Sequence, residues 1–330
     1  MQNYKIKTVK GELPVHVIAP DKFGGEYDRR SFFYVGGVWA ASAFAMVTNL
    51  AQALYRKVAH GGSLDKILWE MGRDRDHISS FAVDRLSKFN HRAKYRAAGW
   101  RSLDLFYNYH ERIKPQLKGD FEGLITRHWI GKLENRQAVT NRLKISIDLL
   151  VAAFSEFSAE KEIRIFSIAS GSAQAVVEAI KRCPQLDIKV LLLDVDTSAI
   201  NESKKMVRDA GLDAHFSYIN DTTKVMEDTA RNFQPHIIEM VGFLDYRRRK
   251  QAIDLIDRIR MHLPEGGIFI TCNIRKNREK IFLDWILLWP MIYRSEEEFA
   301  DVLVNAGFPA KNIRLIYEPF KIHGIAVCRK

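Results

Sequence analysis

The chain has 330 residues, of which 47% are hydrophobic and 28% charged. This composition excludes a disordered chain and indicates two domains, or one large domain with an appendage. Three cysteines (Cys183, Cys272 and Cys328), none in a C-x-x-C pair, exclude a disulfide scaffold and a thiolate zinc site. Lysines interrupt any apolar stretch at the N-terminus, so we expect no cleavable signal and a cytoplasmic protein.

The formal net charge of +11 is concentrated in the first half of the sequence. Residues 1–150 contain 25 lysines and arginines against 15 acidic residues, whereas residues 151–330 contain 26 against 25. A positive field favours anionic partners: an anionic membrane surface, an acidic carrier protein or, less favoured here, nucleic acid. A solvated surface that serves only solubility is the alternative.

The N-terminal segment combines a loop-like stretch with an uncharged one. Residues 1–30 are expected to form loops, because prolines and a glycine pair break any period. Residues 31–55 then run for 25 positions without a charge, between Arg30 and Arg56. That length suffices for a membrane span, but glycines and amides dilute the stretch. We expect a buried or interface helix, with membrane association or a span as alternatives.

Residues 63–153 have helical spacing, with apolar residues at intervals of three and four and basic residues on the opposite faces. Aromatic residues are interleaved with this charge, either as core filler or as platforms for base stacking. We therefore predict that residues 1–150 form a basic, mainly helical region that covers the substrate or binds a partner.

Residues 151–330 alternate short apolar runs with helical stretches. Five such runs predict a doubly wound parallel sheet that is buried on both faces. The end of the chain instead reads as two strands joined by a short turn around residues 318–321. A terminal hairpin of this kind is typical of S-adenosylmethionine (SAM) methyltransferases and not of nicotinamide enzymes.

Small residues follow the first predicted strand, in SIASGSAQ at residues 167–174. They let the backbone approach a ligand, and the next helix points its N-terminus at the same place. The stretch is not G-x-G-x-x-G, because Ala169 and Ala173 stand at two expected glycines. An ordinary strand-to-helix turn is the alternative interpretation.

Acidic residues mark the ends of the next strands. Asp194 stands 23 residues after Gly171, where a carboxylate accepts hydrogen bonds from ribose hydroxyls. Asp196 is expected to start the following helix, with Thr197 or Ser198 as its cap. Asp221, after the third strand, could accept from an adenine amino group or serve as an N-cap.

Residues 160–330 resemble the class I SAM-dependent methyltransferases through the 167–174 loop, the LLLDVD strand end and the EGGIFITCN strand entry. The resemblance implies SAM as cofactor and a Rossmann-like seven-stranded sheet with a terminal antiparallel hairpin. Ser167 stands where the family has an acidic residue. The donor-binding residues that the resemblance implies are Ser167, Ala169, Ser170, Gly171, Ser172, Asp194, Val195, Asp221, Thr222, Glu239, Met240, Gly242 and Arg142.

Two further stretches, GFLDYRRR (242–249) and residues 273–299, resemble a bacterial methyltransferase subgroup. Some members of this subgroup make methyl esters of hydroxylated fatty acids. The likeness implies that Arg136 and Arg142 lie near the carboxylate of SAM. It also implies that the site is lined by Gly242, Asp245, Tyr246, Asn273, Asn277, Trp289, Tyr293 and Arg294.

The chemistry of the acceptor decides which residues catalysis needs. Methyl transfer is an in-line displacement, and a carboxylate acceptor needs a clamp but no general base. Tyr293 and Arg294 could provide that clamp together with Arg275, and Tyr246 is a further catalytic candidate.

A hydroxyl or amine acceptor would need a base, for which His236 and His323 are candidates, although a structural role is the alternative for both. Trp285 and Trp289, with Phe282 and Leu288, form either ordinary core or an apolar wall for an acyl chain.

The sequence therefore predicts a SAM-dependent methyltransferase that acts on a small or lipid-like acceptor, with carboxylate O-methylation as one form of the reaction. An RNA methyltransferase and a non-catalytic SAM-binding protein are the alternatives. We expect no metal site, because no cluster of histidine, cysteine and acidic residues has ligand spacing.

Overall fold

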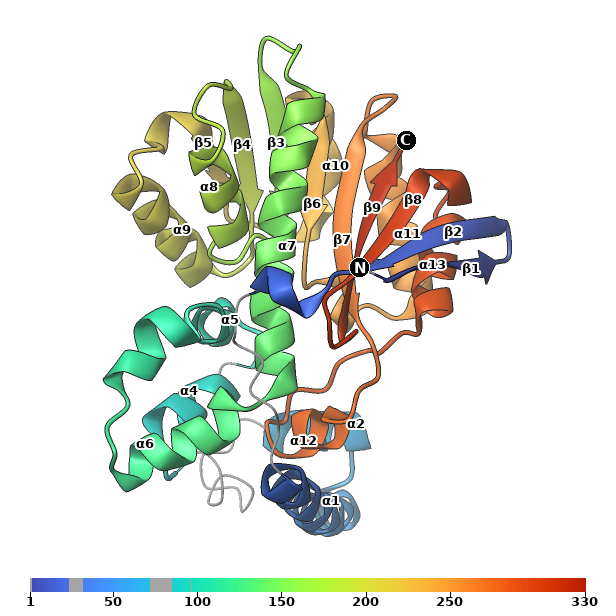
Figure 1. Cartoon of the computed structure of the whole chain (residues 1–330). Helices are drawn as coiled ribbons and strands as arrows, with labels where there is room; N and C mark the ends of the chain where they lie inside the picture. The colour runs from blue at the N-terminus through green and yellow to red at the C-terminus, as the bar shows by residue number, and fades with distance from the viewer. Residues whose placement is uncertain (1, 24–31, 72–84, 96) are drawn as a thin grey trace. The chain divides into compact units, whose positions relative to one another are not determined.

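The computed structural model describes residues 2–23, 32–71, 85–95 and 97–330 (Figure 1). Its internal contacts divide the chain into two compact units. The sheet unit consists of Met1–Lys22, Asn141–Lys276 and Ile292–Lys330, and the helical unit of Phe23–Thr140 and Asn277–Met291. This division differs from the expected split at residue 150, because residues 1–22 join the sheet unit and residues 277–291 join the helical unit.

The sheet unit is built on one nine-stranded sheet in the order β1-β2-β8-β9-β7-β6-β3-β4-β5. Strands β3 to β7 are parallel, and β9 is antiparallel to both of its neighbours. Strands β3 to β9 form the expected seven-stranded sheet with a terminal antiparallel hairpin, which is thereby confirmed. The strands are β1 Gln2–Thr8, β2 Gly11–Val17, β3 Ile163–Ile168, β4 Ile188–Leu193, β5 Phe216–Ile219, β6 Ile237–Met240, β7 Ile268–Ile274, β8 Ile313–Tyr317 and β9 His323–Arg329.

The expectation of loops in the first 30 residues was wrong for the hairpin β1–β2. Strand β2 pairs in parallel with β8 and so extends the sheet by two strands. Leu13, Val15 and Val17 are buried at alternate positions, which is the period of a half-buried strand. Pro14 obscured this signal, but it is tolerated because pairing with β8 begins only at Val15.

Helices cover both faces of the sheet. Helices α10, α11 and α13 pack against one face through a continuous apolar core, and α7 and α8 lie over the other face (Figure 1). Strands β3, β4, β6 and β7 are buried almost throughout, as the uninterrupted apolar runs predict. The helices that begin or lie in this unit are α8 Gln174–Lys181, α9 Thr197–Asp209, α10 Met226–Phe233, α11 Arg249–Met261 and α13 Glu296–Asn305.

The helical unit confirms the helical periodicity of residues 63–153 where the structure describes them. Residues 72–84 and 96 of this stretch lie outside the described residues. Helix α7 starts in this unit and continues into the sheet unit. The helices are α1 Phe32–His60, α2 Leu64–Met71, α4 Lys88–Tyr95, α5 Trp100–Tyr107, α6 Phe121–Thr126, α7 Glu134–Glu156 and α12 Lys280–Trp285.

Candidate functional site

The loop between β3 and α8 has the left-handed backbone conformation of a glycine-rich loop, although two of the three residues in that conformation are alanines. Ala169, Gly171 and Ala173 all have left-handed backbones, with φ of 53°, 56° and 57°. An L-residue pays about 1 kcal/mol for this conformation, so the surrounding hydrogen bonds must hold the two alanines there. The hydroxyl of Ser170 is buried in this loop without a hydrogen-bond partner among the described residues.

Asp194 joins this loop to the end of β4. Its Oδ2 accepts the N–H of Gly171 at 2.8 Å, and its Oδ1 accepts the N–H of Asp196 at 2.8 Å. Burial raises the pKa of this carboxyl, and the two backbone N–H donors oppose the shift. Each oxygen keeps a second lone pair, so the carboxylate can still accept bonds from a ligand.

The ends of β4 and β5 are joined by a residue that sequence reasoning missed. Asn220 donates to the carbonyl of Asp194 at 2.9 Å and accepts the hydroxyl of Thr197 at 2.7 Å. Its position directly after a strand was the available signal. Val195, beside Asp194, is exposed.

Asp196 is itself the N-cap of α9, and accepts the N–H of Ser198, instead of Thr197 or Ser198 being the cap. Thr222 caps the short helix η6, Thr223–Val225, while Asp221 accepts the N–H of Thr222. Asp221 is exposed at the end of β5 and is not the N-cap.

Glu239 supplies a carboxyl beside the position where Ser167 replaces an acid. The two residues are register partners on β6 and β3, and the Ser167 hydroxyl donates to Glu239 Oε2 at 2.5 Å. Burial raises the pKa of Glu239 to about 7, against the lowering effects of Ser167, the Val241 N–H and Arg142. The carboxyl is thus moved to the neighbouring strand and not lost, which sequence reasoning did not see.

Arg142 places a buried guanidinium behind the end of β6. A Cβ on Gly242, whose φ is +91°, would lie 3.6 Å from Arg142 Nη2. Arg142 Nη1 lies 3.5 Å from His323 Nδ1 and 3.7 Å from Cys272 Sγ. Burial and this guanidinium lower the pKa of His323 well below its usual value. His323 is therefore neutral and oriented toward a cation.

The comparisons with known proteins agree with this arrangement. The sequence profile of the family described as "Putative methyltransferase" matches residues 64–271, more than half of the chain. The chain belongs to this methyltransferase family. No curated protein sequence matches it significantly.

Two solved structures show the same fold as the methyltransferase. A "possible exported protein" from Bordetella parapertussis has a TM-score of 0.57 at 12% identity, over 95% of this chain and 99% of that one. The CurJ carbon methyltransferase has a TM-score of 0.53 at 13% identity, over 88% and 90%.

The family is one of methyltransferases, and the strand ends of this chain have groups that fit SAM as the methyl donor. The left-handed loop exposes backbone close to α8, and Ser170 offers a buried hydroxyl that no described residue satisfies. Asp194 follows β4 and Glu239 lies near the end of β6, so the two carboxyls belong to the two strands that flank β3. Met240, Ser172 and Arg142 are buried.

Three residues of the narrower resemblance form one buried hydrogen-bond cluster in the methyltransferase. Asp245 Oδ1 accepts from the Ile274 N–H at 2.7 Å and from Asn273 Nδ2 at 3.0 Å. Arg294 donates to Asn273 and to the carbonyls of Leu244 and Arg247. These contacts make Arg294 a positioning residue that ties the loop after β6 to the end of β7.

Tyr246 and Tyr293, the other catalytic candidates, are half-buried residues next to this cluster in sequence. Tyr246 ends the short helix η7, Leu244–Tyr246. Tyr293 immediately precedes Arg294. Both phenols therefore belong to the segments that follow β6 and β7 on the sheet unit.

Other predicted residues belong to the helical unit. Asn277 accepts the N–H of Glu279 at 2.9 Å. Arg136 is buried, donates to the carbonyl of Gly131 at 2.7 Å and lies over the ring of Tyr109. Its implied place near the donor carboxylate is not supported, because local carbonyls and a ring hold its guanidinium within that unit.

The tryptophan pair does not share a helix face. Helix α12 ends at Trp285, and Leu288 has a left-handed backbone with φ of 49°. Trp289 packs near Phe106 at 5.9 Å between ring centroids, and Phe282 stacks on Trp129 at 5.3 Å. These contacts favour the core interpretation.

Two other basic candidates, His236 and Arg275, are held by structural contacts. His236 precedes β6 at its amino end, where its ring stacks on Phe157 and accepts the N–H of Arg164, so it faces the wrong end of the sheet to act as a base. Arg275 forms an ion pair with the buried Glu296 at 3.3 Å.

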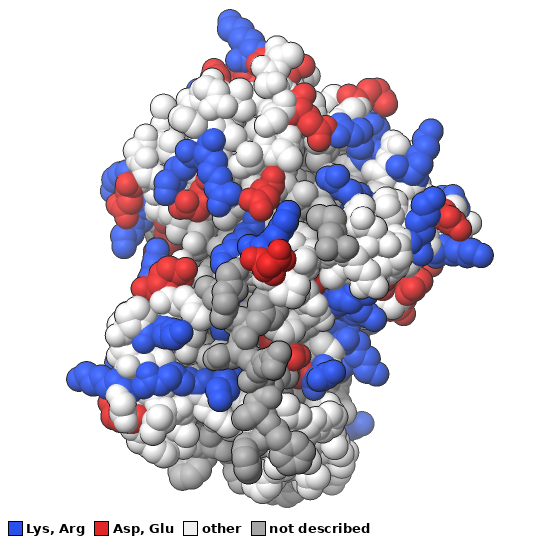
Figure 2. All heavy atoms as spheres, in the orientation of Figure 1, with Lys and Arg blue, Asp and Glu red and all other residues white. Residues whose placement is uncertain are grey.

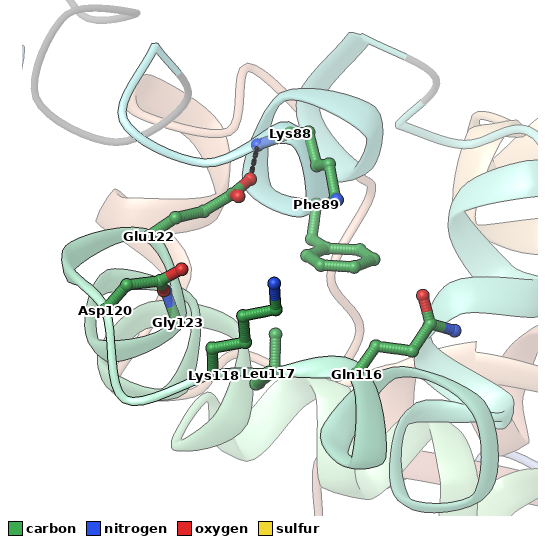
Figure 3. Close-up of a pocket in the computed structure, with 8 residues that line it drawn as sticks. All are labelled: Lys88, Phe89, Gln116, Leu117, Lys118, Asp120, Glu122 and Gly123. Atoms are coloured by element: carbon green, nitrogen blue, oxygen red, sulfur yellow. Dashed lines mark hydrogen bonds between the residues drawn. The ribbon is translucent and has the colours of Figure 1, made fainter.

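Two cavities in the described part of the chain lie away from the carboxyl ends of the strands. A hollow of about 450 Å³ beside His236 lies at the amino ends of β3 and β6. A pocket of about 110 Å³ in the helical unit is shown in Figure 3. There Asp120 and Glu122 accept backbone N–H groups of Gly123 and Lys88, each at 2.8 Å. Both carboxylates are thus engaged at helix starts.

Proposed function

We propose that this methyltransferase methylates a carboxylate of a small or lipid-like acceptor and so forms a methyl ester. The observation that supports this proposal is the state of three titratable groups near the carboxyl ends of β6 and β7: Asp245, Cys272 and His323, the last at the amino end of the antiparallel β9. Those described groups are committed to the fold, and a carboxylate is the acceptor that needs no proton removed.

Three groups there are poor general bases. His323 is neutral and its Nδ1 faces Arg142. Burial raises the pKa of Cys272 to about 12, so its thiol stays protonated. Asp245 accepts two N–H groups within a buried cluster. A hydroxyl or amine acceptor would lack a partner for its proton among these side chains.

SAM, when bound, would supply an electrophilic methyl group: the acceptor carboxylate would form the new O–CH3 bond as the methyl–sulfur bond breaks and S-adenosylhomocysteine leaves. Asp194 would accept the ribose hydroxyls while it keeps the Gly171 loop in place. Glu239 would receive the ammonium of SAM, with the Ser167 hydroxyl fixing the orientation of that carboxyl. The phenols of Tyr246 and Tyr293 would orient the acceptor carboxylate by hydrogen bonds.

The test uses methyl-labelled SAM and a total cell extract. Methyl esters release labelled methanol in mild alkali, whereas methyl ethers, N-methyl groups and C-methyl groups are stable. Organic-soluble label that becomes volatile in alkali supports the proposal. Label that resists alkali, or that enters the RNA fraction, refutes it. The Asp194→Ala variant is the matched control for donor-dependent transfer.

A further inference from the structure

Helix α1 presents an unusually apolar surface to its surroundings. Trp39 is 53% exposed, Leu54 49%, Tyr55 71% and Val58 88%. Other large apolar side chains exposed on this helix are Phe44, Met46, Val47 and Leu50. Isolated exposed apolar residues are ordinary, but a continuous set along one helix marks an interaction surface.

Two polar side chains of α1 point inward instead. Ser42 and Asn49 are buried, and Asn49 Nδ2 donates to the carbonyl of Trp285 on α12 at 2.5 Å. The hydroxyls of Ser42 and Thr48 donate to the helix's own carbonyls, of Val38 and Phe44, at 2.6 and 2.9 Å. This is the reverse of a water-facing amphipathic helix, in which the polar side chains cover the outer face.

Charge begins only at the end of the helix. Residues 32–55 carry none, and Arg56, Lys57 and His60 follow, with Lys57 exposed. In Figure 2 the part of the molecule formed by α1 shows predominantly uncharged surface over its described residues. Tyr34–His60 is long and apolar enough to cross a membrane, and only 28% of its most apolar 18-residue stretch is buried in the protein.

From this arrangement we propose that α1 docks on an anionic lipid surface and lies in its plane, with the outer face in the headgroup and acyl boundary. The side that carries Ser42 and Asn49 stays on the protein, so the helix is half-embedded and does not span. Tyr55 and Trp39 have the amphipathic rings that favour the interface.

Charge complementarity favours lipid as the occupant of this face. Residues 1–150 carry a net charge of +10, and Lys57 adjoins the apolar face. Anionic lipids attract such charge by about 1 kcal/mol per basic residue near the surface. A second copy of the chain could cover the face by packing its own α1 against it, and the experiment below distinguishes that outcome. A fluid bilayer needs no matching shape.

The experiment is vesicle flotation of the full-length protein. Vesicles of phosphatidylcholine alone are compared with vesicles that contain about 30% phosphatidylglycerol, at low and high salt. Leu54→Glu tests the apolar face, and Lys57→Glu tests the charge. Leu124→Glu is the matched control, because Leu124 on α6 is 57% exposed, similar to Leu54. Circular dichroism checks that each variant is folded.

We expect the wild type and Leu124→Glu to float with the anionic vesicles. Leu54→Glu should reduce partitioning about tenfold, and Lys57→Glu at least about fivefold, because it removes one attracted charge and adds a repelled one. Partitioning that is equal for Leu54→Glu and the control overturns the proposal. A wild type that remains in the bottom fraction of the gradient also overturns it. If that protein is a dimer by light scattering and Leu54→Glu is a monomer, the apolar face joins two copies of the chain. The outcome does not depend on the identity of the methyl acceptor.

Discussion

Replacing Glu239 by glutamine tests whether its buried carboxyl receives the ammonium of the donor. Burial raises the pKa of this group to about 7. At that pKa, roughly 9% of the carboxyl is ionised at pH 6 and roughly 76% at pH 7.5. If binding requires the ionised form, the affinity of the wild type for SAM should rise about eightfold over this range.

The same shift predicts an opposite trend in the stability of the ligand-free protein. The folded-state pKa is raised above the usual value of 4.5, so the folded state disfavours the charged form. The contribution of Glu239 is then full below pH 4.5 and is lost as the pH rises through about 7. Relative to the wild type, Glu239→Gln should therefore gain stability between pH 5 and pH 8.

Isothermal titration calorimetry with SAM at several pH values is the assay, and urea unfolding gives the stability. The titration of the donor itself cancels in the comparison, because Glu239→Gln meets the same donor. Glu178→Gln, on the exposed side of α8, should keep the pH dependence of the wild type. An equal slope of affinity against pH in wild type and Glu239→Gln would refute the reasoning.

Three further predictions concern the loop and the buried cluster. Asp194→Ala should weaken SAM binding by about 1–3 kcal/mol, because a charge-assisted acceptor is lost; unchanged affinity in calorimetry removes Asp194 from the site. Ala173→Gly should raise the free energy of unfolding by up to about 1 kcal/mol by relieving a left-handed alanine, whereas Ala175→Gly, inside helix α8, should lower it by a similar amount. Denaturant unfolding distinguishes the two, and equal losses would contradict the strain argument. Arg294→Ala should lower the free energy of unfolding by about 3 kcal/mol, because it leaves Asn273 and backbone carbonyls without their donor. If this variant instead keeps wild-type stability and loses turnover, Arg294 acts in catalysis and not in positioning.

Local patterns predicted much of the fold. The apolar runs of β3, β4, β6 and β7 are buried on both faces, which is typical of a parallel sheet covered by helices. The terminal strands β8 and β9 were also readable, since a turn separates two apolar runs. The hairpin β1–β2 was missed because Pro14 obscures the alternation in β2, and its place beside β8 was missed because that pairing joins residues about 300 apart, which no local signal reports.

The candidate site divides in the same way. Asp194 and the loop at Ala169 were found because their spacing from a strand end is set by local chain geometry. Asn220 and the exchange of an acid between Ser167 and Glu239 were missed, because they depend on which strands are neighbours. Arg294 was predicted to clamp the acceptor carboxylate, because a charged residue in a motif suggests a catalytic role. In the structure its guanidinium donates hydrogen bonds to backbone carbonyls.

The sequence alone determined where the chain alternates strand and helix, because hydrophobic period is a property of each segment. It also placed an acidic residue at the end of β4 and an uncharged stretch in α1. Only the tertiary structure decided which way α1 turns its polar residues and where the buried carboxyl of Glu239 meets Ser167. Those outcomes depend on long-range packing, which sets what each side chain faces.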